Sequence, residues 1–596
     1  MTVKQAPRVV RLQERDPIDR EQVGNKAWGI VRMRGLGLPV PPAFVLPVSE
    51  CRRYHEHDEA LDEQTWADVL DGLRWLETET GKGFGDASAP LLVSVRSGAV
   101  VSMPGMMDTV LNLGMTSEIE KALARTSGDA DFARDTHARF CHQFGRVVLG
   151  ADVDADGDEG PEQLQGAIAR DCGHDFPQDP YEQLRLAVCA VFQSWGSRRA
   201  VAYRRHWGLS DVGGTAVTIQ AMVFGNLTGD SGTGVFFTRD PLTGDPRPYG
   251  EWLCKGQGED VVSGTHAVQT LHDLAVQLPE VHTELLRAGE LLERENGDVQ
   301  DIEFTVEQGQ LFLLQTRAAK RSPAAAVRTA VDFAEAGVID ESSALLRVTA
   351  EQVTTLLQPR LSSDAVLGEP VASGEPACFG VAVGIAVRDS EAAEAAAAEG
   401  RDVVLVRPTT SPEDIAGMIA ARAVVTELGG STSHAAVVAR ALGRPCIVGT
   451  GTGSTAAWIG QEVTVDAGKG LVYRGRLATE QVRAEDDPGL SRLLQWARAV
   501  SPVTVLDAPQ PDTVDLDAAG VGLDSGVAPS LEDVVATLRG AASARGAVLG
   551  SPVGAEALLA AEVPAAVLAP GQQELVLLLQ LVHARPRRAA ALSVSG

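Results

Sequence analysis

Short apolar runs alternate with helix-like stretches along the first 340 residues. Runs bounded by Gly, Pro or Asp predict buried or half-buried strands. These runs are LLVSV at 91–95, TAVTIQAMVFG at 215–225, GVFFTRDP at 234–241 and QLFLLQT at 310–316. Residues 117–210 are mostly helical in pattern, with polar breaks at DVDADGDEGPEQ and HDFPQDP. The pattern predicts a mixed α+β domain over residues 1–340, with its helical part at about 117–210.

The pattern changes after residue 340. Residues 341–370 are predicted to form a helical connector, and residues 371–480 alternate buried strands with helices, as in a compact α/β unit. A polar linker is predicted over 481–504, and residues 505–596 form an Ala-, Val- and Leu-rich tail of short βα units. The predicted fold class is therefore a multidomain chain of α/β and α+β units.

Composition and charge narrow the classes of partner. The chain has 52 basic and 80 acidic residues and a net charge of -28, which argues against nucleic acid as the main partner. No apolar run approaches the roughly 18 residues of a membrane span, and the charged N-terminus is unlike a signal peptide. The seven cysteines are scattered without a CxxC spacing, so we expect reduced thiols and a cytoplasmic protein.

A first candidate site is the segment SVRSGAVVSMPGMMDTVLNLG, residues 94–114. Arg96 follows a predicted strand, and Gly98 and Gly105 flank a turn. A glycine-rich turn lets backbone N–H groups approach phosphate oxygens, and a nearby arginine neutralises them. A hydrophobic hairpin, with the methionines of residues 103–107 in a core, explains the same residues equally well.

A second candidate site is QDIEFTVEQGQLFLLQTR, residues 300–317. Asp301 and Glu303 lie two residues apart on a predicted strand and so face the same side, as do Gln315 and Arg317 on the next strand. Carboxylate and amide oxygens suit Mg²⁺, which shares its ligands with phosphates. The alternative is a surface hairpin with cross-strand pairs.

A third candidate site is GGSTSHAAVVARALGRPCIVG, residues 429–449. His434 lies in the first turn of a predicted helix, where free N–H groups and the helix dipole favour an anion. A neutral imidazole nitrogen there could accept a phosphoryl group. A hydrogen-bonded structural histidine is the alternative, and the neighbouring hydroxyl groups of Thr432 and Ser433 weaken it.

These segments, with GQGEDVVSG at 256–264 and SPEDIAGM at 411–418, resemble pyruvate phosphate dikinase, a family of phosphoenolpyruvate-utilising enzymes. The similarity runs in order from about residue 20 to about residue 500. The resemblance implies an ATP-grasp-like nucleotide domain over 1–340 and a swivelling phosphohistidine domain over 371–480. It also implies a C-terminal (β/α)8 barrel for pyruvate, of which residues 505–596 would be a short remnant.

The resemblance also assigns roles to residues. His434 matches the phosphoryl carrier, and Thr432 matches a threonine that is a regulatory phosphorylation site in plant relatives. Matches to nucleotide or metal contacts, with Glu303 and Gln315 as the expected ligands of Mg²⁺, are Lys26, Arg96, Gly105, Asp301, Glu303, Gln315 and Arg317. The implied substrates are ATP and inorganic phosphate, and a homodimer is compatible with the family.

The sequence departs from the family pattern at several points. GNKA at 24–27 stands where the family has GGKG, and Leu428 and Ser431 replace the usual Arg and Met around the double glycine. The larger departure is the barrel, because GVGLDSG at 520–526 replaces a segment with Arg-Thr-Glu, and the tail has only 92 residues. Tail residues such as Glu574 and His583 are therefore expected to be solvated.

The predicted function is a dikinase-type phosphotransferase that phosphorylates its own His434 from Mg-ATP and passes the group to an acceptor. The acceptor would be pyruvate on a separate barrel protein, or another small molecule. The alternative is a non-catalytic, regulatory relative that binds nucleotide and transfers nothing. An antibiotic phosphotransferase of the rifampin type is disfavoured, because the connector leaves no room for its extra substrate domain.

Overall fold

The fold was obtained as a computed structural model of the chain. It describes residues 7–13, 18–99, 109–153, 159–206, 213–261, 267–357, 360–362, 368–442, 444–480, 482–519, 521, 529–568 and 572–594. Among these residues, no helix has the length and apolarity needed to cross a membrane.

An antiparallel sheet with strand order β1-β2-β7-β5-β6 organises the N-terminal part of the chain. Its strands are β1 (Val10–Arg11), β2 (Ala43–Leu46), β5 (Val93–Gly98), β6 (Thr109–Leu113) and β7 (Ala216–Ala221). The helices α1 (Arg20–Gly35), α2 (Val48–Glu56) and α3 (Glu63–Thr80) and the short strands β3 (Gly83–Phe84) and β4 (Pro90–Leu91) precede β5. The predicted strands at 91–95 and 215–225 thus correspond to central strands of this sheet.

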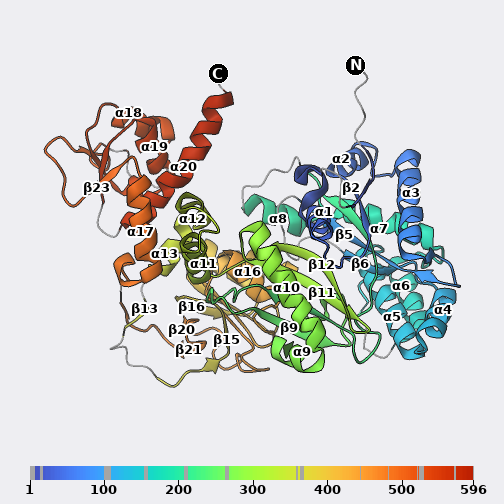
Figure 1. The fold of residues 1–596 in the computed structure, drawn as a ribbon. Helices are drawn as coiled ribbons and strands as arrows, with labels where there is room; N and C mark the ends of the chain where they lie inside the picture. Colours follow the sequence, from blue (N-terminus) through green and yellow to red (C-terminus); the bar gives the residue numbers. More distant parts are fainter. Residues whose placement is uncertain are drawn as a thin grey trace, which may run out of the picture.

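The predicted helical part lies between β6 and β7. It consists of α4 (Ser117–Ser127), α5 (Ala130–Val147), α6 (Pro161–Cys172), α7 (Pro180–Ser194) and α8 (Arg198–His206). The side chains of Thr116, Asp129 and Asp179 cap three of these helices by accepting backbone N–H groups. In Figure 1 the helices α4, α5, α6 and α7 lie at one end of the molecule, and their apolar faces share a core with the first sheet.

A second antiparallel sheet, with strand order β10-β9-β8-β11-β12, follows the helical part. It is formed by β8 (Gly232–Phe237), β9 (Tyr249–Cys254), β10 (Gln269–Thr270), β11 (Gln300–Glu307) and β12 (Gln310–Ala318). The helices α9 (Leu271–Gln277) and α10 (Pro279–Asn296) pack with it, and α1 contributes to the same core. The β11–β12 hairpin places Asp301 opposite Arg317 and Glu303 opposite Gln315, so the predicted shared faces are confirmed.

A mixed sheet with strand order β14-β21-β20-β16-β17-β18-β19-β15 forms the next unit. Its strands are β14 (Ala372–Ser373), β15 (Glu375–Cys378), β16 (Val381–Val387), β17 (Val403–Arg407), β18 (Ala423–Thr426), β19 (Cys446–Val448), β20 (Glu462–Asp466) and β21 (Leu471–Arg474). The helices α14 (Ser390–Ala398), α15 (Ile415–Ala420) and α16 (His434–Leu442) cover one face. The short strand β13 (Arg360–Leu361) precedes this unit in the sequence and β22 (Thr479–Glu480) follows it, and these two strands pair with each other.

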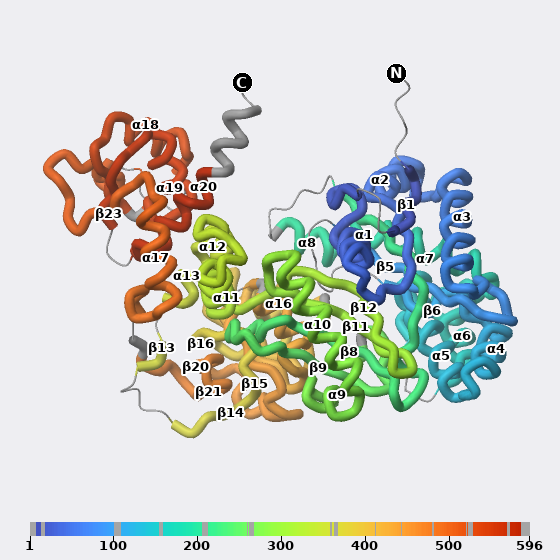
Figure 2. Tube along the Cα trace, viewed as in Figure 1, coloured from blue at the N-terminus to red at the C-terminus, as the bar shows by residue number. Residues whose placement is uncertain are grey.

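The tail shares one hydrophobic core with helices from earlier segments. The parallel strands β23 (Thr504–Leu506), β24 (Val514–Asp515), β25 (Ala544–Arg545) and β26 (Ala565–Val567) pack with α18 (Leu531–Leu538), α19 (Pro552–Ala560) and α20 (Glu574–Val594). The same core includes α11 (Pro323–Glu335), α12 (Glu341–Arg347), α13 (Ala350–Leu356) and α17 (Pro488–Val500). The helices α12 and α13 of the predicted connector and α17 of the predicted linker therefore pack directly on the tail. Figure 2 shows the tail in orange and red beside α12.

Candidate active site

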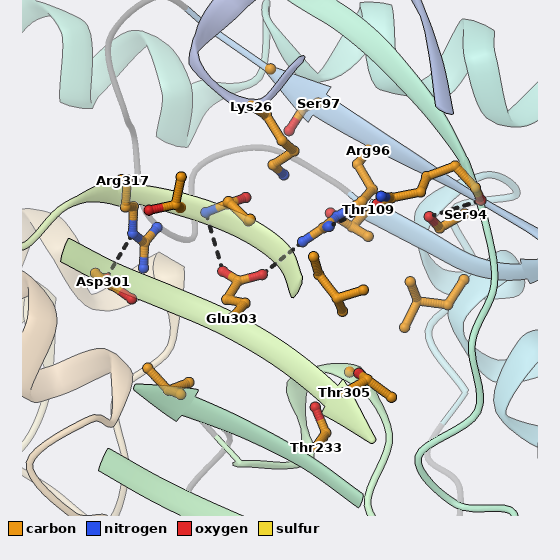
Figure 3. A pocket seen from close by; sticks show the side chains of 18 of the residues that line it. Lys26, Ser94, Arg96, Ser97, Thr109, Thr233, Asp301, Glu303, Thr305 and Arg317 are labelled. Atoms are coloured by element: carbon orange, nitrogen blue, oxygen red, sulfur yellow. Dashed lines mark hydrogen bonds and ion pairs between the residues drawn. The ribbon is translucent and has the colours of Figure 1, made fainter. Parts of the chain in front are cut away.

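A cavity of about 550 Å³ lies between the two N-terminal sheets and the start of α16. Side chains from β5, β11, β12 and α1 line it together with His434 of α16. Figure 3 shows Arg96, Glu303, Asp301 and Arg317 converging on this space from three strands. Segments more than 300 residues apart in the sequence thus meet at one site.

The β11–β12 hairpin supplies paired charges to the floor of the cavity. Arg96 Nη2 donates to Glu303 Oε2 at 2.7 Å, and Arg317 Nε donates to Asp301 Oδ2 at 2.8 Å (Figure 3). Gln315 Nε2 donates to Glu303 Oε1 at 3.2 Å. The alternating cations and carboxylates form a network that holds each side chain in place.

Burial and nearby positive charge shift the pKa values of Asp301 and Glu303 in opposite directions. Burial raises the pKa of Asp301, and the Arg317 guanidinium only partly offsets this. Burial alone would raise the pKa of Glu303 as well, but the nearby guanidinium groups of Arg96 and Arg317 outweigh it and lower that pKa. Glu303 is therefore the group held in its charged form.

The oxygen atoms of the hairpin fit a hard cation that shares its ligands with phosphate. Asp301 Oδ1 and Gln315 Oε1 are buried and have no hydrogen-bond partner in the described structure. Unpaired buried oxygens beside a charged carboxylate are the donor set that Mg²⁺ prefers. No group of three or more His, Cys, Asp or Glu side chains among the described residues could hold a metal alone.

Lys26 approaches the cavity from α1, on the side opposite the hairpin (Figure 3). The helix can come this close because Gly24 has a φ of +75° and a Cβ atom there would lie 2.1 Å from the Gly98 carbonyl oxygen. Gly105, predicted at the same site, falls in the segment 100–108, outside the described residues. The predicted roles of Lys26 and Gly105 stay predictions.

His434 is the first residue of α16 and faces the same cavity. Its Nδ1 atom lies 3.1 Å from Thr410 Oγ1, whereas its Nε2 atom is buried without a partner among the described residues. Burial lowers the pKa of His434 to about 4, although the Asp414 carboxylate acts in the opposite direction. The imidazole is therefore neutral near pH 7, as a nitrogen nucleophile requires.

The loop before His434 is docked on β9 of the second sheet. The Thr432 hydroxyl donates to the Glu251 carboxylate, and the Ser431 and Tyr249 hydroxyl groups are hydrogen-bonded. Burial raises the pKa of Glu251, while its hydrogen bond with Thr432 acts in the opposite direction. These contacts fix the loop so that His434 reaches the cavity.

Sequence reasoning missed three of these residues, namely Thr410, Tyr249 and Glu251. Thr410 follows β17 and the loop to His434 follows β18, and these strands are parallel neighbours. The carboxyl ends of parallel strands meet at one edge, so this spacing was a usable signal. Tyr249 and Glu251 could not be found from the sequence, because their role depends on how β9 packs against the loop before His434.

The tail residues Glu574 and His583, expected to be solvated, are partly exposed and also contact neighbouring segments. Glu574 accepts both hydrogen bonds of a bidentate pair from Arg498, at 2.7 and 2.6 Å. His583 is half-buried, and its Nε2 atom lies 3.1 Å from the Val348 carbonyl oxygen of the α12–α13 connection. Both residues fasten the tail to neighbouring helices.

Comparison with known proteins gives one matching family model in the N-terminal part of the chain and one in the unit that contains His434. The model for pyruvate phosphate dikinase, AMP/ATP-binding domain, matches residues 60–279, and that for PEP-utilising enzyme, mobile domain, matches residues 399–470. The pyruvate, phosphate dikinase of Rhizobium meliloti is 41% identical over 534 residues, covering 82% of this chain and 59% of that protein. The Clostridium symbiosum enzyme is 37% identical over 558 residues, covering 86% and 64%.

The chloroplastic pyruvate, phosphate dikinase 1 of Arabidopsis thaliana is 39% identical over 543 residues, covering 84% of this chain and 56% of that protein. The chain thus spans less than two thirds of the length of these relatives. The two segments with matching family models are residues 60–279 and residues 399–470. Over these two segments, the chain is similar to the pyruvate phosphate dikinase family.

Proposed function

We propose that this protein is a dikinase-type phosphotransferase that moves a phosphoryl group from Mg-ATP to His434. With inorganic phosphate present, the expected products are AMP and pyrophosphate. One observation supports this above all: the Nε2 atom of the neutral His434, which has no partner among the described residues, lies in the same cavity as the cations Arg96 and Arg317. A nucleophile and phosphate-binding groups in one enclosed space are what phosphoryl transfer requires.

Each residue of the site would have a role that follows from its chemistry. Arg96, Arg317 and Lys26 would hold phosphate oxygens and neutralise their charge. Glu303 and Gln315 would hold Mg²⁺, which when bound screens charge between the phosphates. His434 Nε2 would attack phosphorus with its lone pair, and the buried surroundings would exclude water as a competing acceptor.

The domain boundaries 1–340, 371–480 and 505–596 are part of the same proposal. The first would be the ATP-grasp-like nucleotide domain, the second the swivelling phosphohistidine domain and the third a remnant of a barrel. The phosphoryl acceptor would be pyruvate on a separate barrel protein or another small molecule. The alternative of a regulatory relative that only binds nucleotide is less well supported, since an unpartnered nucleophilic nitrogen has no use in it.

The test is labelling of the full chain with ATP that carries ³²P in either the β or the γ position. We expect an acid-labile, base-stable label that is absent from His434→Gln, a variant of similar size without a nucleophilic nitrogen. Nucleotide products are measured with and without inorganic phosphate, and AMP identifies the dikinase reaction. A label of full strength in His434→Gln, or no label in the wild type, would refute the proposal.

A further inference from the structure

The two ring nitrogens of His434 have different surroundings. Nδ1 lies 3.1 Å from the Thr410 hydroxyl oxygen, and Nε2 has no partner in the described part of the chain. A neutral imidazole carries its proton on one nitrogen only, and the hydrogen bond at the other end decides which. Thr410 is therefore placed to select the tautomer of the residue that accepts the phosphoryl group.

The loop that holds Thr410 is fixed by a buried carboxylate. Asp414 is 4% exposed and accepts hydrogen bonds from the Ser411 N–H at 2.9 Å and the Ser390 hydroxyl at 3.1 Å. Arg407 Nε lies 3.0 Å from Asp414 Oδ1, as an ion pair without hydrogen-bond alignment. These contacts join the loop to β17 and α14, so the hydroxyl of Thr410 has a defined position beside the imidazole.

The surroundings of Nε2 favour one of the two tautomers. A proton on Nε2 would leave a buried N–H without an acceptor, and orphaned buried N–H groups are rarer than under-satisfied acceptors. The cavity that Nε2 faces also contains the cations Arg96 and Arg317, which repel an N–H dipole and attract a lone pair. A proton on Nδ1 instead has the Thr410 oxygen as its acceptor.

We propose that Thr410 is a positioning residue whose hydroxyl oxygen accepts the Nδ1 proton of His434 and leaves Nε2 bare as the phosphoryl acceptor. That Nε2 accepts a phosphoryl group rests on the proposed function. The Nε2 lone pair forms the N–P bond as the P–O bond of the phosphoanhydride breaks, and that electron pair leaves on the bridging oxygen. The Nδ1 proton stays in place, and Thr410 stabilises the positive charge that develops on the ring.

The test compares the full-length wild type with Thr410→Val, which keeps the side-chain shape, and Thr410→Ser, which keeps the hydroxyl group. Magic-angle-spinning NMR of ring-¹⁵N-histidine protein reports the tautomer without nucleotide, and subtraction of the His434→Gln spectrum assigns the signals. We expect the Nδ1–H tautomer in the wild type and in Thr410→Ser, and a mixture in Thr410→Val.

A second readout is the rate and the position of labelling from ATP. Phosphorylation in Thr410→Val should be about five- to tenfold slower, the effect of one lost hydrogen bond, and Thr410→Ser should recover most of the rate. Alkaline hydrolysis should yield only Nε2-phosphohistidine from the wild type and some Nδ1 isomer from Thr410→Val. Thr410→Ala replaces Thr410→Val if the thermal midpoint shows that the valine variant is misfolded.

The outcomes separate this proposal from the function on which it rests. An Nε2–H tautomer in the wild type, or the same tautomer preference in wild type and Thr410→Val, would overturn the role of Thr410. An unlabelled wild type that still shows the tautomer change would refute the proposed function and retain the control of the tautomer by Thr410.

Discussion

Replacing Arg317 by methionine tests whether this residue binds phosphate in addition to pairing with Asp301. Arg317 is 23% exposed and pairs with Asp301, whose side chain is 2% exposed. Its removal leaves a buried carboxylate without its cation, and Asp301 Oδ1 already has no partner in the described structure. Breaking a fully buried pair costs about 3–5 kcal/mol, and the partial exposure of Arg317 reduces our expectation to about 2–3 kcal/mol.

The effect on ATP is a separate quantity. A charge-assisted contact contributes about 1.5–3 kcal/mol, so Arg317→Met should raise the Kd for Mg-ATP about 10- to 150-fold. The control is the double variant Arg317→Met/Asp301→Asn, which removes the orphaned charge. We expect it to regain most of the lost thermal stability while its ATP affinity remains low.

Titration calorimetry with Mg-ATP and thermal unfolding of the same samples measure both effects. Asp301→Asn alone reports how much of the affinity depends on that carboxylate. If the double variant recovered both stability and ATP affinity, Arg317 would act only by holding the hairpin together. Unchanged affinity in folded Arg317→Met would also refute a phosphate contact.

His434, Glu251 and the tail each lead to a further measurement. Because burial lowers the pKa of His434 to about 4, acid destabilises its docked, neutral form only as the pH falls from about 6.5 towards 4. Single-turnover labelling should therefore keep its rate from about pH 7.5 to 6, and a fall centred near pH 6.5 would show a solvated imidazole. Burial raises the pKa of Glu251, so docking should be strongest while this carboxyl group is protonated and weaken as the pH rises through that raised pKa. Energy transfer between dyes on the two units should follow this trend, and the same trend in Glu251→Gln would contradict it. Finally, the chain alone should form no phosphoenolpyruvate from ATP, phosphate and pyruvate in a coupled assay, since residues 505–596 contain no Arg-Thr-Glu segment. Turnover without an added barrel protein would show that the acceptor site lies in this chain.

The hairpin of the active site could be predicted from sequence because its information is local. A period of two places Asp301 and Glu303 on one face, and the turn at Gln308 and Gly309, both with positive φ, sets the pairing of the strands. The contact from Arg96 to Glu303 was not predictable in this way, because it joins two different sheets. Its residues could be named as candidates, but their distance depends on how the sheets pack.

The tail shows the same limit for packing between helices. The segment predicted as a linker over 481–504 contains the amphipathic helix α17, whose buried residues Leu490, Leu493 and Trp496 require a partner surface. Nothing in that pattern names the partner, which is the shared core of α11–α13 and the C-terminal sheet. Amphipathicity states that a face must be buried, whereas only the tertiary structure states which elements bury it.

The position of α11 decides which unit must move if His434 is to reach another acceptor. Phe333 of α11 packs in a core with the second sheet, while Val327 and Ala330 of the same helix pack with the C-terminal unit. A single helix buried in two cores joins these units firmly. The unit of residues 371–480, which contains His434, instead lies between α13 and α17 in sequence, and β13 and β22 pair at its two connections.

Movement of His434 would therefore rotate residues 371–480 about these two connections, with the nucleotide-binding part and the tail left together. The rotation must break the hydrogen bonds of Thr432 with Glu251 and of Tyr249 with Ser431 and Glu375. It must also withdraw Tyr203 of α8, which is 4% exposed, from the core that it shares with α15 and α16. A hydrogen bond contributes about 0.5–1.5 kcal/mol, so these polar contacts alone oppose the rotation by only a few kcal/mol.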